Sequence, residues 1–509
     1  MDTLPLLPVI IPLLCAALMT FCYNAPLALQ RVMGMASVAL LLGVALLMAT
    51  QLPGQDHLLY MLGGWQPPFG IVLVVDRLSV LMLVLTAVLA GFCLVYASRG
   101  HDREGAHFHT LVQFQLVGIN GAFVTGDLFN LFVFFELLLI ASYALLLQGG
   151  GAARGRAGLH YVVLNLIGSA FFVVAIGLLY GVTGTLNMAD MALRIAAAPA
   201  ADQPLINAAS LLLLAVFGVK AALLPLLFWL PRAYIAASAP VAALFAIMTK
   251  VGIYAMLRVF ALVFGLQEGL AATLAWQWLW PLALATLTLG AIGVLGAANL
   301  RGITAYLVIV SVGTLLAALS LGSEAAVAAA LFYLVHSTLL TAAFFLFADL
   351  IGRQRGEALD SLRVTAAMSQ RKPLGILFFF GAIALVGLPP FSGFVSKLWL
   401  LQVTADTPAQ GAFWLLVLLA GFIILIALSR AGSKLFWRQP EQSADGPPAD
   451  PVRLGVVAGM LLCSVALVLL GDPLMDFTEA AARTLLAPAD YIAAVQTLAI
   501  DPLGGGLTE

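Results

Sequence analysis

The feature that most constrains this chain is a succession of apolar segments, each roughly 18–30 residues long and separated by short polar loops. A helix of about 20 apolar residues crosses the hydrocarbon core of a bilayer. In lipid, only helices and closed barrels satisfy their backbone polar groups, and these segments lack the two-residue alternation of barrel strands. Only 9% of the residues are charged, against about 25% in soluble domains. The sequence therefore predicts an all-α polytopic membrane protein.

About fourteen transmembrane helices are predicted. They cover residues 4–23, 32–50, 71–97, 108–125, 128–147, 159–182, 206–230, 240–264, 276–298, 303–321, 325–351, 373–403, 413–436 and 454–471. No cleavable signal peptide is expected, because Met1, Asp2 and Thr3 precede the first span without a basic residue.

The distribution of lysine and arginine predicts the orientation in the membrane, because short cytoplasmic loops carry an excess of both. The opposite loops and the C-terminal tail hold only Arg194 and Arg483 among acids such as Asp190, Asp202, Glu268, Glu324 and Asp406. We therefore expect the basic loops to be cytoplasmic and both termini to lie on the outer face. The basic loops hold Arg31, Arg99, Arg103, Arg154, Arg156, Arg232, Arg301, Arg353, Arg355, Arg363, Arg371, Lys372, Arg430, Lys434, Arg438 and Arg453.

Two predicted spans contain helix breakers in their interiors. Pro225 interrupts the seventh span, and Pro389, Pro390 and Gly393 interrupt the twelfth. Proline removes a backbone donor and clashes with the preceding turn. An opened backbone at membrane depth is tolerated only against protein or a wet cavity. We therefore expect discontinuous helices 7 and 12.

The two broken spans lie five spans apart, which suggests an internal repeat of five helices whose second copy is inverted. The predicted divisions are residues 1–107 with helices 1–3, 108–264 with the first repeat, 276–437 with the second, and 454–509 with helix 14 and an outer tail. This tail is amphipathic in places and is expected along the membrane or on a partner. Flexible cytoplasmic loops are expected at 149–158 and 439–451.

Ionisable residues remain inside the spans at Glu136, Lys220, Lys250, His336 and Lys397. Each charge near the bilayer centre costs about 2.5–3.5 kcal/mol, so a function is indicated. A carboxylate that approaches a buried amine keeps it protonated, and one that withdraws releases the proton. An imidazole changes charge near neutral pH and suits a relay. Polar residues that could hold connecting waters are Ser142, Asn165, Ser169, Ser238, Thr249, Ser311, Ser337, Thr338, Thr341 and Ser396.

Structural roles compete with the relay. The buried carboxylate and lysines could form ion pairs within the bundle, and His336 could be a hydrogen-bonded core histidine. Arg258 is expected to be structural or to reach the interface, and Asp76 and Arg77 are expected to pair with each other at an outer end. Three histidines share a cytoplasmic loop, where solvated side chains are favoured over a metal site: His101, His107 and His109.

Taken with these residues, the chain resembles the D-type component of Mrp-type (Mnh, Sha or Pha) monovalent cation/proton antiporters, a family homologous to the antiporter-like membrane subunits of respiratory complex I. The resemblance implies that Glu136 pairs with Lys220, that Lys250 and His336 continue the proton relay, and that Lys397 is its terminal lysine. The most specific segment is GDLFNLFVFFE at 126–136. Supporting segments are FGVK at 217–220, TKVGIY at 249–254, HST at 336–338 and GLPPFSGF at 387–394.

The resemblance implies a proton-translocating subunit of a multisubunit Na⁺(K⁺)/H⁺ antiporter in the bacterial inner membrane, in contact with lipids and with other subunits of a heteromeric complex. Two alternatives remain: a proton-pumping subunit of a complex I or membrane-bound hydrogenase, and a non-conducting scaffold. The sequence has no Rossmann glycine pattern, haem motif or Fe–S cysteine set. We therefore expect no cofactor, metal or enzymatic activity, and no nucleic-acid partner.

Overall fold

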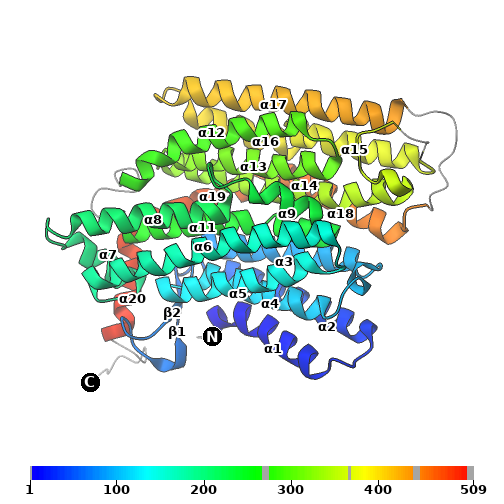
Figure 1. Cartoon of the computed structure of the whole chain (residues 1–509). Helices are drawn as coiled ribbons and strands as arrows, with labels where there is room; N and C mark the ends of the chain where they lie inside the picture. Colours follow the sequence, from blue (N-terminus) through cyan, green and yellow to red (C-terminus); the bar gives the residue numbers. More distant parts are fainter. Residues whose placement is uncertain (1–2, 266–273, 365–367, 439–447, 501–509) are drawn as a thin grey trace.

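The computed structural model describes residues 3–265, 274–364, 368–438 and 448–500. It is a bundle of helices that run side by side, with one small two-stranded sheet at one end (Figure 1). Within the described ranges, twelve helical segments are long and apolar enough to cross a membrane. The chain is therefore an all-helical polytopic membrane protein apart from that sheet. The predicted acid Glu268 and most of the predicted loop 439–451 lie outside the described residues.

The helices follow one another along nearly the whole chain. They are α1 (Leu7–Phe21), α2 (Leu27–Gln51), α3 (Arg77–Ala97), α4 (Phe108–Val124), α5 (Leu128–Leu147), α6 (Ala152–Thr183), α7 (Met188–Ala196), α8 (Gln203–Ala221), α9 (Trp229–Ala236), α10 (Ala239–Phe245), α11 (Met248–Val263), α12 (Leu274–Gly296), α13 (Leu300–Leu319), α14 (Glu324–Gln354), α15 (Arg371–Val386), α16 (Ser392–Thr404), α17 (Gln410–Gly432), α18 (Pro451–Leu469), α19 (Gly471–Leu485) and α20 (Pro488–Ile500). Short turns of 3₁₀-helix include η1 (Leu4–Leu6) and η3 (His101–Arg103).

Two of the predicted spans are missing from the twelve because their helices are short. The predicted span 108–125 corresponds to α4, which has 17 residues. The predicted span 373–403 is divided into α15 and α16 around Pro389 and Pro390. Gly393 lies in the first turn of α16 and not in the break itself.

The seventh predicted span is interrupted in the same manner, since α8 ends at Ala221 and α9 begins at Trp229, with Pro225 between them. Side chains bind backbone groups that the break releases. The indole nitrogen of Trp229 donates to the Val219 carbonyl at 3.0 Å, and the Leu224 amide donates to Thr286 Oγ1 at 2.9 Å. This agrees with the rule that an opened backbone inside a membrane needs internal partners.

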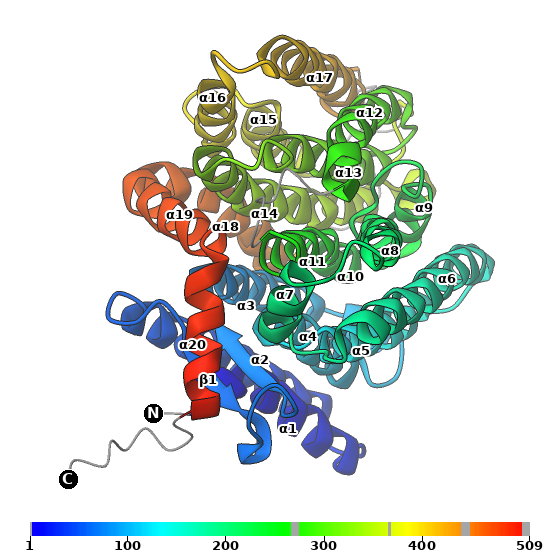
Figure 2. The ribbon, with the colours of Figure 1, turned by 90° about the vertical axis from the view of Figure 1, so that its left-hand side faces the viewer.

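The centre of the bundle is formed by α10, α11, α13 and α14 (Figure 2). The apolar windows of Ala239–Val263 and Glu324–Gln354 are wholly buried, whereas those of the outlying helices α2, α6 and α18 are 39% or less buried. Both helices α11 and α14 carry ionisable residues, at Lys250 and His336. These two residues therefore lie where neither water nor lipid has direct access.

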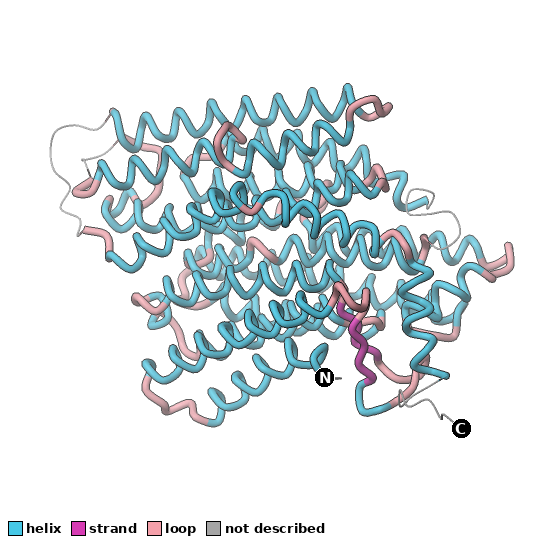
Figure 3. The backbone as a smooth tube through the Cα atoms, turned by 180° about the vertical axis from the view of Figure 1, so that it is seen from behind, coloured by secondary structure: helices cyan, strands magenta, loops and turns pink. Residues whose placement is uncertain are grey.

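A group of elements that the sequence did not reveal gathers at one end of the bundle (Figure 3). Strands β1 (Leu58–Met61) and β2 (Val72–Val75) form an antiparallel hairpin, and η1 packs against both. The predicted span 71–97 therefore begins with a strand. The C-terminal tail forms α19, which packs on α3 and α14 of the same chain, and α20, which contacts α7. The tail thus covers its own bundle.

Candidate functional site

The five ionisable residues singled out from the sequence lie on α5, α8, α11, α14 and α16. Lys220, Lys250 and His336 are 5%, 0% and 2% exposed, while Glu136 and Lys397 are half-buried. None of the three lysines forms an ion pair within 4.0 Å in the part of the chain that the structure describes. Lys220 and Lys250 are thus buried, and Lys397 half-buried, without a carboxylate partner among the described residues, which is unusual for a structural role.

Helix α6 connects the first two groups. Ser169 donates a hydrogen bond to Glu136 Oε1, and Asn165, one turn earlier on α6, accepts from Lys220 Nζ at 3.3 Å. Lys220 also lies 5.9 Å from the centre of the Phe135 ring. Glu136 and Lys220 are therefore not in direct contact here. Both bind polar side chains on the same face of α6.

Lys250 is held by hydroxyl groups alone. Its Nζ donates to Ser311 Oγ on α13 at 3.0 Å and to Thr249 Oγ1 at 3.3 Å. Thr314 lies one turn along α13 from Ser311, and its side chain contacts the Tyr333 hydroxyl of α14. Hydroxyl groups of α13 and α14 thus extend from Lys250 towards His336.

His336 continues this line into the broken helix. The Tyr333 and His336 ring centres are 6.0 Å apart, and His336 Nδ1 lies 2.8 Å from Ser392 Oγ at the start of α16. Ser392 Oγ in turn lies 2.7 Å from Ser464 Oγ of α18. Ring and hydroxyl groups therefore connect α14 with two further helices.

Lys397 binds the end of the interrupted helix α15. Its Nζ donates to the carbonyls of Val386 at 2.6 Å and Leu385 at 3.3 Å. The last carbonyls of a helix lack intrahelical partners and carry a partial negative charge, so the break supplies the counter-charge for this ammonium group.

Sequence reasoning named Asn165, Ser169 and Ser311 but missed other polar groups in this line. Thr314 and Tyr333 resemble ordinary residues of apolar helices, and Ser464 is remote in sequence, so no pattern distinguished them. Ser392 lies within the GLPPFSGF segment and could have been singled out. Conversely, Ser337, Thr338 and Thr341 donate to carbonyls of their own helix, and Ser142 contacts the Tyr161 hydroxyl.

At the β1–β2 end, the expected pairing of Asp76 with Arg77 is wrong. Asp76 Oδ2 lies 2.7 Å from Arg258 Nη2, whereas Arg77 pairs with Asp56 at 2.5 Å. Tyr254 lies one turn from both Lys250 and Arg258 on α11, and its hydroxyl accepts from Arg258 Nε at 3.3 Å. The permanently charged pair of Asp76 and Arg258 thus lies at this end of α11.

At the opposite end, the expectation of a solvated histidine loop is wrong for two of three residues. His107 is exposed, but His101 and His109 are buried at 5% and 1% exposure. His101 Nε2 lies 3.0 Å from Asp349 and its Nδ1 lies 2.7 Å from Glu104. In the described part of the chain, no group of three or more His, Cys, Asp or Glu residues could hold a metal ion.

The stability of this end is expected to depend on pH. Burial alone would lower the pKa of His101, but hydrogen bonds to Asp349 and Glu104 outweigh burial and raise its pKa. A group with a raised folded-state pKa stabilises the fold fully below its unfolded value, about 6.5, and loses this contribution as pH rises through the folded-state pKa. The thermal stability of the wild type should therefore fall as the pH rises from about 6 to 9, and this fall should be absent in His101→Asn.

His107→Asn is the matched control for that measurement, because His107 is exposed and its φ of 60° suits asparagine. It should leave the pH dependence of unfolding as in the wild type. Identical pH profiles for His101→Asn and the wild type would show that His101 gains no proton affinity on folding.

Comparison with known proteins shows what this arrangement resembles. The family model described as NADH:quinone oxidoreductase/Mrp antiporter, TM, matches residues 125–426, which include all five ionisable residues. The chain is 41% identical to the D component of a probable K⁺/H⁺ antiporter of Rhizobium meliloti, over 96% of this chain and 97% of that protein. It is 38% identical to the D component of a Na⁺/H⁺ antiporter of Bacillus subtilis, over 97% and 99% of the two chains.

Solved structures of membrane complexes also match nearly the whole chain. A chain of the Mrp complex from Dietzia sp. matches with a TM-score of 0.86 and 26% identity, over 97% of this chain and 99% of that one. A chain of an archaeal membrane-bound sulfane sulfur reductase matches with a TM-score of 0.87 and 26% identity, over 97% and 100%. A chain of Thermus thermophilus respiratory complex I, at 24% identity and a TM-score of 0.72 over 92% and 98%, shares the fold.

Proposed function

Because the chain belongs to the NADH:quinone oxidoreductase/Mrp antiporter transmembrane family, we propose that it is the D-type component of a Na⁺(K⁺)/H⁺ antiporter and that it moves protons along its buried polar line. The proposed carriers are Glu136, Lys220, Lys250, His336 and Lys397. The protein transports ions and catalyses no chemical conversion.

One observation carries this proposal: Lys220, Lys250 and Lys397 bind only neutral oxygen atoms among the described residues. An amine that is not fixed by a carboxylate can release its proton. Asn165 next to Lys220 can orient the ammonium group or hold a water, and the hydroxyls of Thr249 and Ser311 next to Lys250 can pass protons or hold water. Movement of Glu136 towards Lys220 across α6 would favour protonation of the Lys220 amine, and movement away would favour release of the proton.

The broken helices would permit this movement. Lys220 lies in the last turn of α8, directly before the interruption, so a small change of the 222–228 backbone moves its amine. Lys397 lies one turn into α16, directly after the other interruption. Helix breaks of this kind serve as hinges and ion sites in transporters.

We also propose fourteen transmembrane helices, formed by the twelve long segments together with α4 and the pair α15–α16. Residues 108–264 and 276–437 would be the inverted five-helix repeats, between the helices of 1–107 and of 454–509. Equivalent contacts recur 172 positions apart in support of this. Gly118 and Gly121 of α4 lie against Leu138 and Phe134 of α5, as Gly290 and Gly293 of α12 lie against Val310 and Tyr306 of α13.

The helix caps repeat with the same spacing. Asp127 caps α5 and forms an isolated bridge with Asn187, while Asn299 caps α13 and forms one with Ser361. The symmetry is incomplete at the broken helices, where Lys220 precedes the interruption and Lys397 follows it.

In the proposed orientation, the arginine-rich loops face the cytoplasm of a bacterial inner membrane and both termini lie on the outer face. Partners would be the other subunits of a heteromeric antiporter, as the names of the two antiporter relatives and of the Dietzia Mrp complex suggest. The exchanged ions would be H⁺ and Na⁺ or K⁺, and the surrounding lipids would contact the outlying helices.

Everted membrane vesicles from an antiporter-deficient bacterial host test this function. With a pH gradient established and followed by a pH-sensitive dye, added Na⁺ or K⁺ should dissipate the gradient only when this chain is produced together with its neighbouring subunits. Vesicles that carry those subunits without this chain are the control. Equal dissipation in both preparations would contradict the proposal.

The alternative function is a redox-driven proton pump, which the matches to sulfane sulfur reductase and complex I also permit. It predicts that the chain copurifies with redox subunits and that a reductant, not Na⁺ or K⁺, drives proton movement. The antiporter relatives, at 41% and 38% identity against 26% and 24% for the redox complexes, favour the antiporter.

A further inference from the structure

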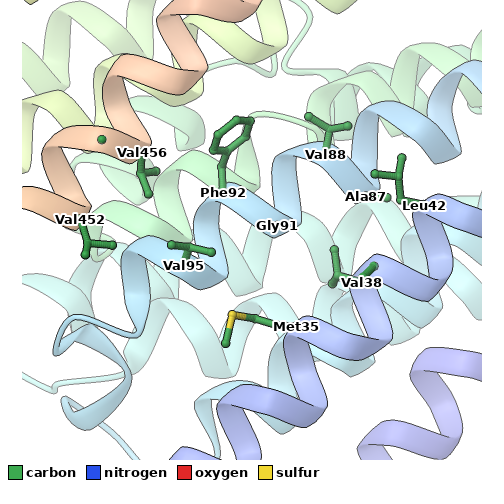
Figure 4. A pocket seen from close by; sticks show the side chains of 12 residues that line it. Met35, Val38, Leu42, Ala87, Val88, Gly91, Phe92, Val95, Val452 and Val456 are labelled. Atoms are coloured by element: carbon green, nitrogen blue, oxygen red, sulfur yellow. The ribbon is translucent and has the colours of Figure 1, made fainter.

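An apolar groove of about 570 Å³ opens on the surface of the bundle between α2, α3 and α18 (Figure 4). All twelve residues that line it are apolar. Helix α3 forms the floor with Val88, Gly91 and Val95. Helices α2 and α18 form the two walls, with side chains such as Met35 and Val456 (Figure 4). None of the residues of the proposed proton route lines the groove.

The groove occupies one half of the membrane thickness. Its lining on α3 runs from Ala87 to Val95, which at 1.5 Å per residue is about 12 Å. One leaflet contributes about 15 Å of the hydrocarbon core, half of about 30 Å. The groove therefore extends from the arginine-rich end of the bundle to about mid-depth, which is the reach of a lipid acyl chain from one leaflet.

Three arginines surround the mouth of the groove. Arg31 lies one turn before Met35, Arg99 lies one turn after Val95, and Arg453 follows Val452 directly. Asp102 pairs with Arg31 and Asp450 pairs with Arg99, whose side chain is 44% exposed.

Arg453 has no carboxylate partner in the described part of the chain. It forms no ion pair there, it is 6% exposed, and its Nε is buried without a hydrogen-bond partner. One of its terminal nitrogens donates to the Arg99 carbonyl at 2.5 Å. Its guanidinium lies 5.4 Å from the centre of the buried Tyr96 ring, and of the three arginines it alone has no carboxylate within 4.0 Å in the described part of the chain.

The size of the groove distinguishes its possible occupants. A transmembrane helix of 20 residues is about 30 Å long, whereas the groove lining on α3 runs only from Ala87 to Val95, about 12 Å, so more than half of such a helix would lie outside the groove. A flexible acyl chain fits a narrow apolar channel of this length, and basic pockets on the cytoplasmic side of helix bundles bind anionic lipid head groups.

We propose that this groove binds an anionic phospholipid, with one acyl chain along α3 and the phosphate at Arg99 and Arg453. The lipid supplies the negative charge that Arg453 lacks and fills the apolar surface between α2 and α18, which both pack on α3. It would brace the α2–α3–α18 side of the bundle against the moving helices.

Lipid retention tests the proposal. The complex that contains this chain is placed in nanodiscs of equal phosphatidylglycerol and phosphatidylcholine, and the lipids that remain bound are counted by native mass spectrometry. We expect phosphatidylglycerol to be retained about fivefold more than phosphatidylcholine for each arginine that contacts the phosphate. Gly455→Leu should abolish this retention, because Gly455 lines the groove and has open space beside it.

Matched variants separate the groove from general effects. Gly177→Leu on α6 also points into open space but lies outside the groove, so it should retain the lipid. Arg99→Gln should lower the preference about fivefold, whereas Arg430→Gln, an exposed arginine at the same end, should not.

Three outcomes would overturn the proposal. They are equal retention of both lipids, undiminished phosphatidylglycerol in Gly455→Leu, and capture of a neighbouring subunit instead of lipid by a photo-crosslinker at position 88. Free glycerol phosphate, added in excess, should not displace the bound lipid, because most of the proposed contact is apolar.

Discussion

Replacement of Lys220 by alanine is expected to reduce cation-dependent proton exchange by about 100-fold or more, the usual effect of removing an essential proton carrier. Lys220 is 5% exposed, and its ammonium binds Asn165 at 3.3 Å. Without the amine, none of the five proposed carriers remains between Glu136 on α5 and Lys250 on α11. The initial rate of gradient dissipation by Na⁺ or K⁺ in everted vesicles measures the loss.

Lys372→Ala is the matched control, because Lys372 is an exposed lysine at the start of α15, and its loss should leave exchange unchanged. Glu136→Ala should cause the same loss as Lys220→Ala. Removal of Lys220 breaks no ion pair among the described residues, so we expect normal amounts of the variant in the assembled complex. Exchange at the wild-type rate in an assembled Lys220→Ala complex would exclude Lys220 from the proton route.

Much of the fold could be predicted because lipid imposes a simple rule on each segment. Apolar stretches of sufficient length must be helices, and most predicted spans have a helix at the expected place. The rule says nothing about short elements at the membrane surface. Residues 72–75 are as apolar as a helix, yet they form β2, because the antiparallel partner β1 satisfies their backbone groups. That partner is a tertiary contact, which composition does not encode.

The residues of the site could be predicted in the same way, but not their partners. A charge inside an apolar run is visible in the sequence because it is costly. Which group lies next to it depends on helix rotation and on neighbours remote in the chain. Ser392, which contacts His336, and Ser464, which contacts Ser392, are 72 positions apart, and no local pattern relates them.

Asp76 and Arg77 illustrate this failure. Adjacent residues at the start of a helix point about 100° apart. Asp76 caps α3 by accepting from the Ser79 amide, which directs its carboxylate into the bundle towards α11. Arg77 is turned outwards to Asp56 and Thr484. Opposite charges next to each other in sequence are therefore poor evidence for a pair when one of them caps a helix.

The division between arginine and lysine in this structure has a chemical reason. Arginine keeps its proton under all ordinary conditions, whereas lysine loses its proton when it is desolvated. The buried Arg258, the half-buried Arg31 and the exposed Arg353 pair with carboxylates near the two ends of the bundle. The lysines between them bind neutral oxygen atoms. Fixed charges thus hold the ends of the bundle, and the exchangeable ones lie in the middle.

Removal of one partner of the Asp76–Arg258 ion pair should cost more stability than removal of one partner from any other charged contact among the described residues. Both side chains are almost wholly buried, at 2% and 5% exposure. Loss of one member of a buried pair leaves an uncompensated charge and costs about 3–5 kcal/mol. Asp76→Asn is expected to lower the free energy of unfolding by this amount, measured by denaturant unfolding in detergent. Asparagine caps helices as well as aspartate does, so the cap on α3 is retained and the effect is that of the charge.

Asp190→Asn is the matched control, because Asp190 pairs with Arg194 on α7, where the arginine side chain is 50% exposed. An exposed pair of this kind contributes at most about 1 kcal/mol. The double variant Asp76→Asn, Arg258→Met should recover most of the loss, since it removes both charges and leaves none buried without a partner. If Asp76→Asn were no more destabilising than Asp190→Asn, the pair would not hold α3 to α11. If the double variant were as unstable as the sum of its single changes, the loss would come from packing and not from an unpaired charge.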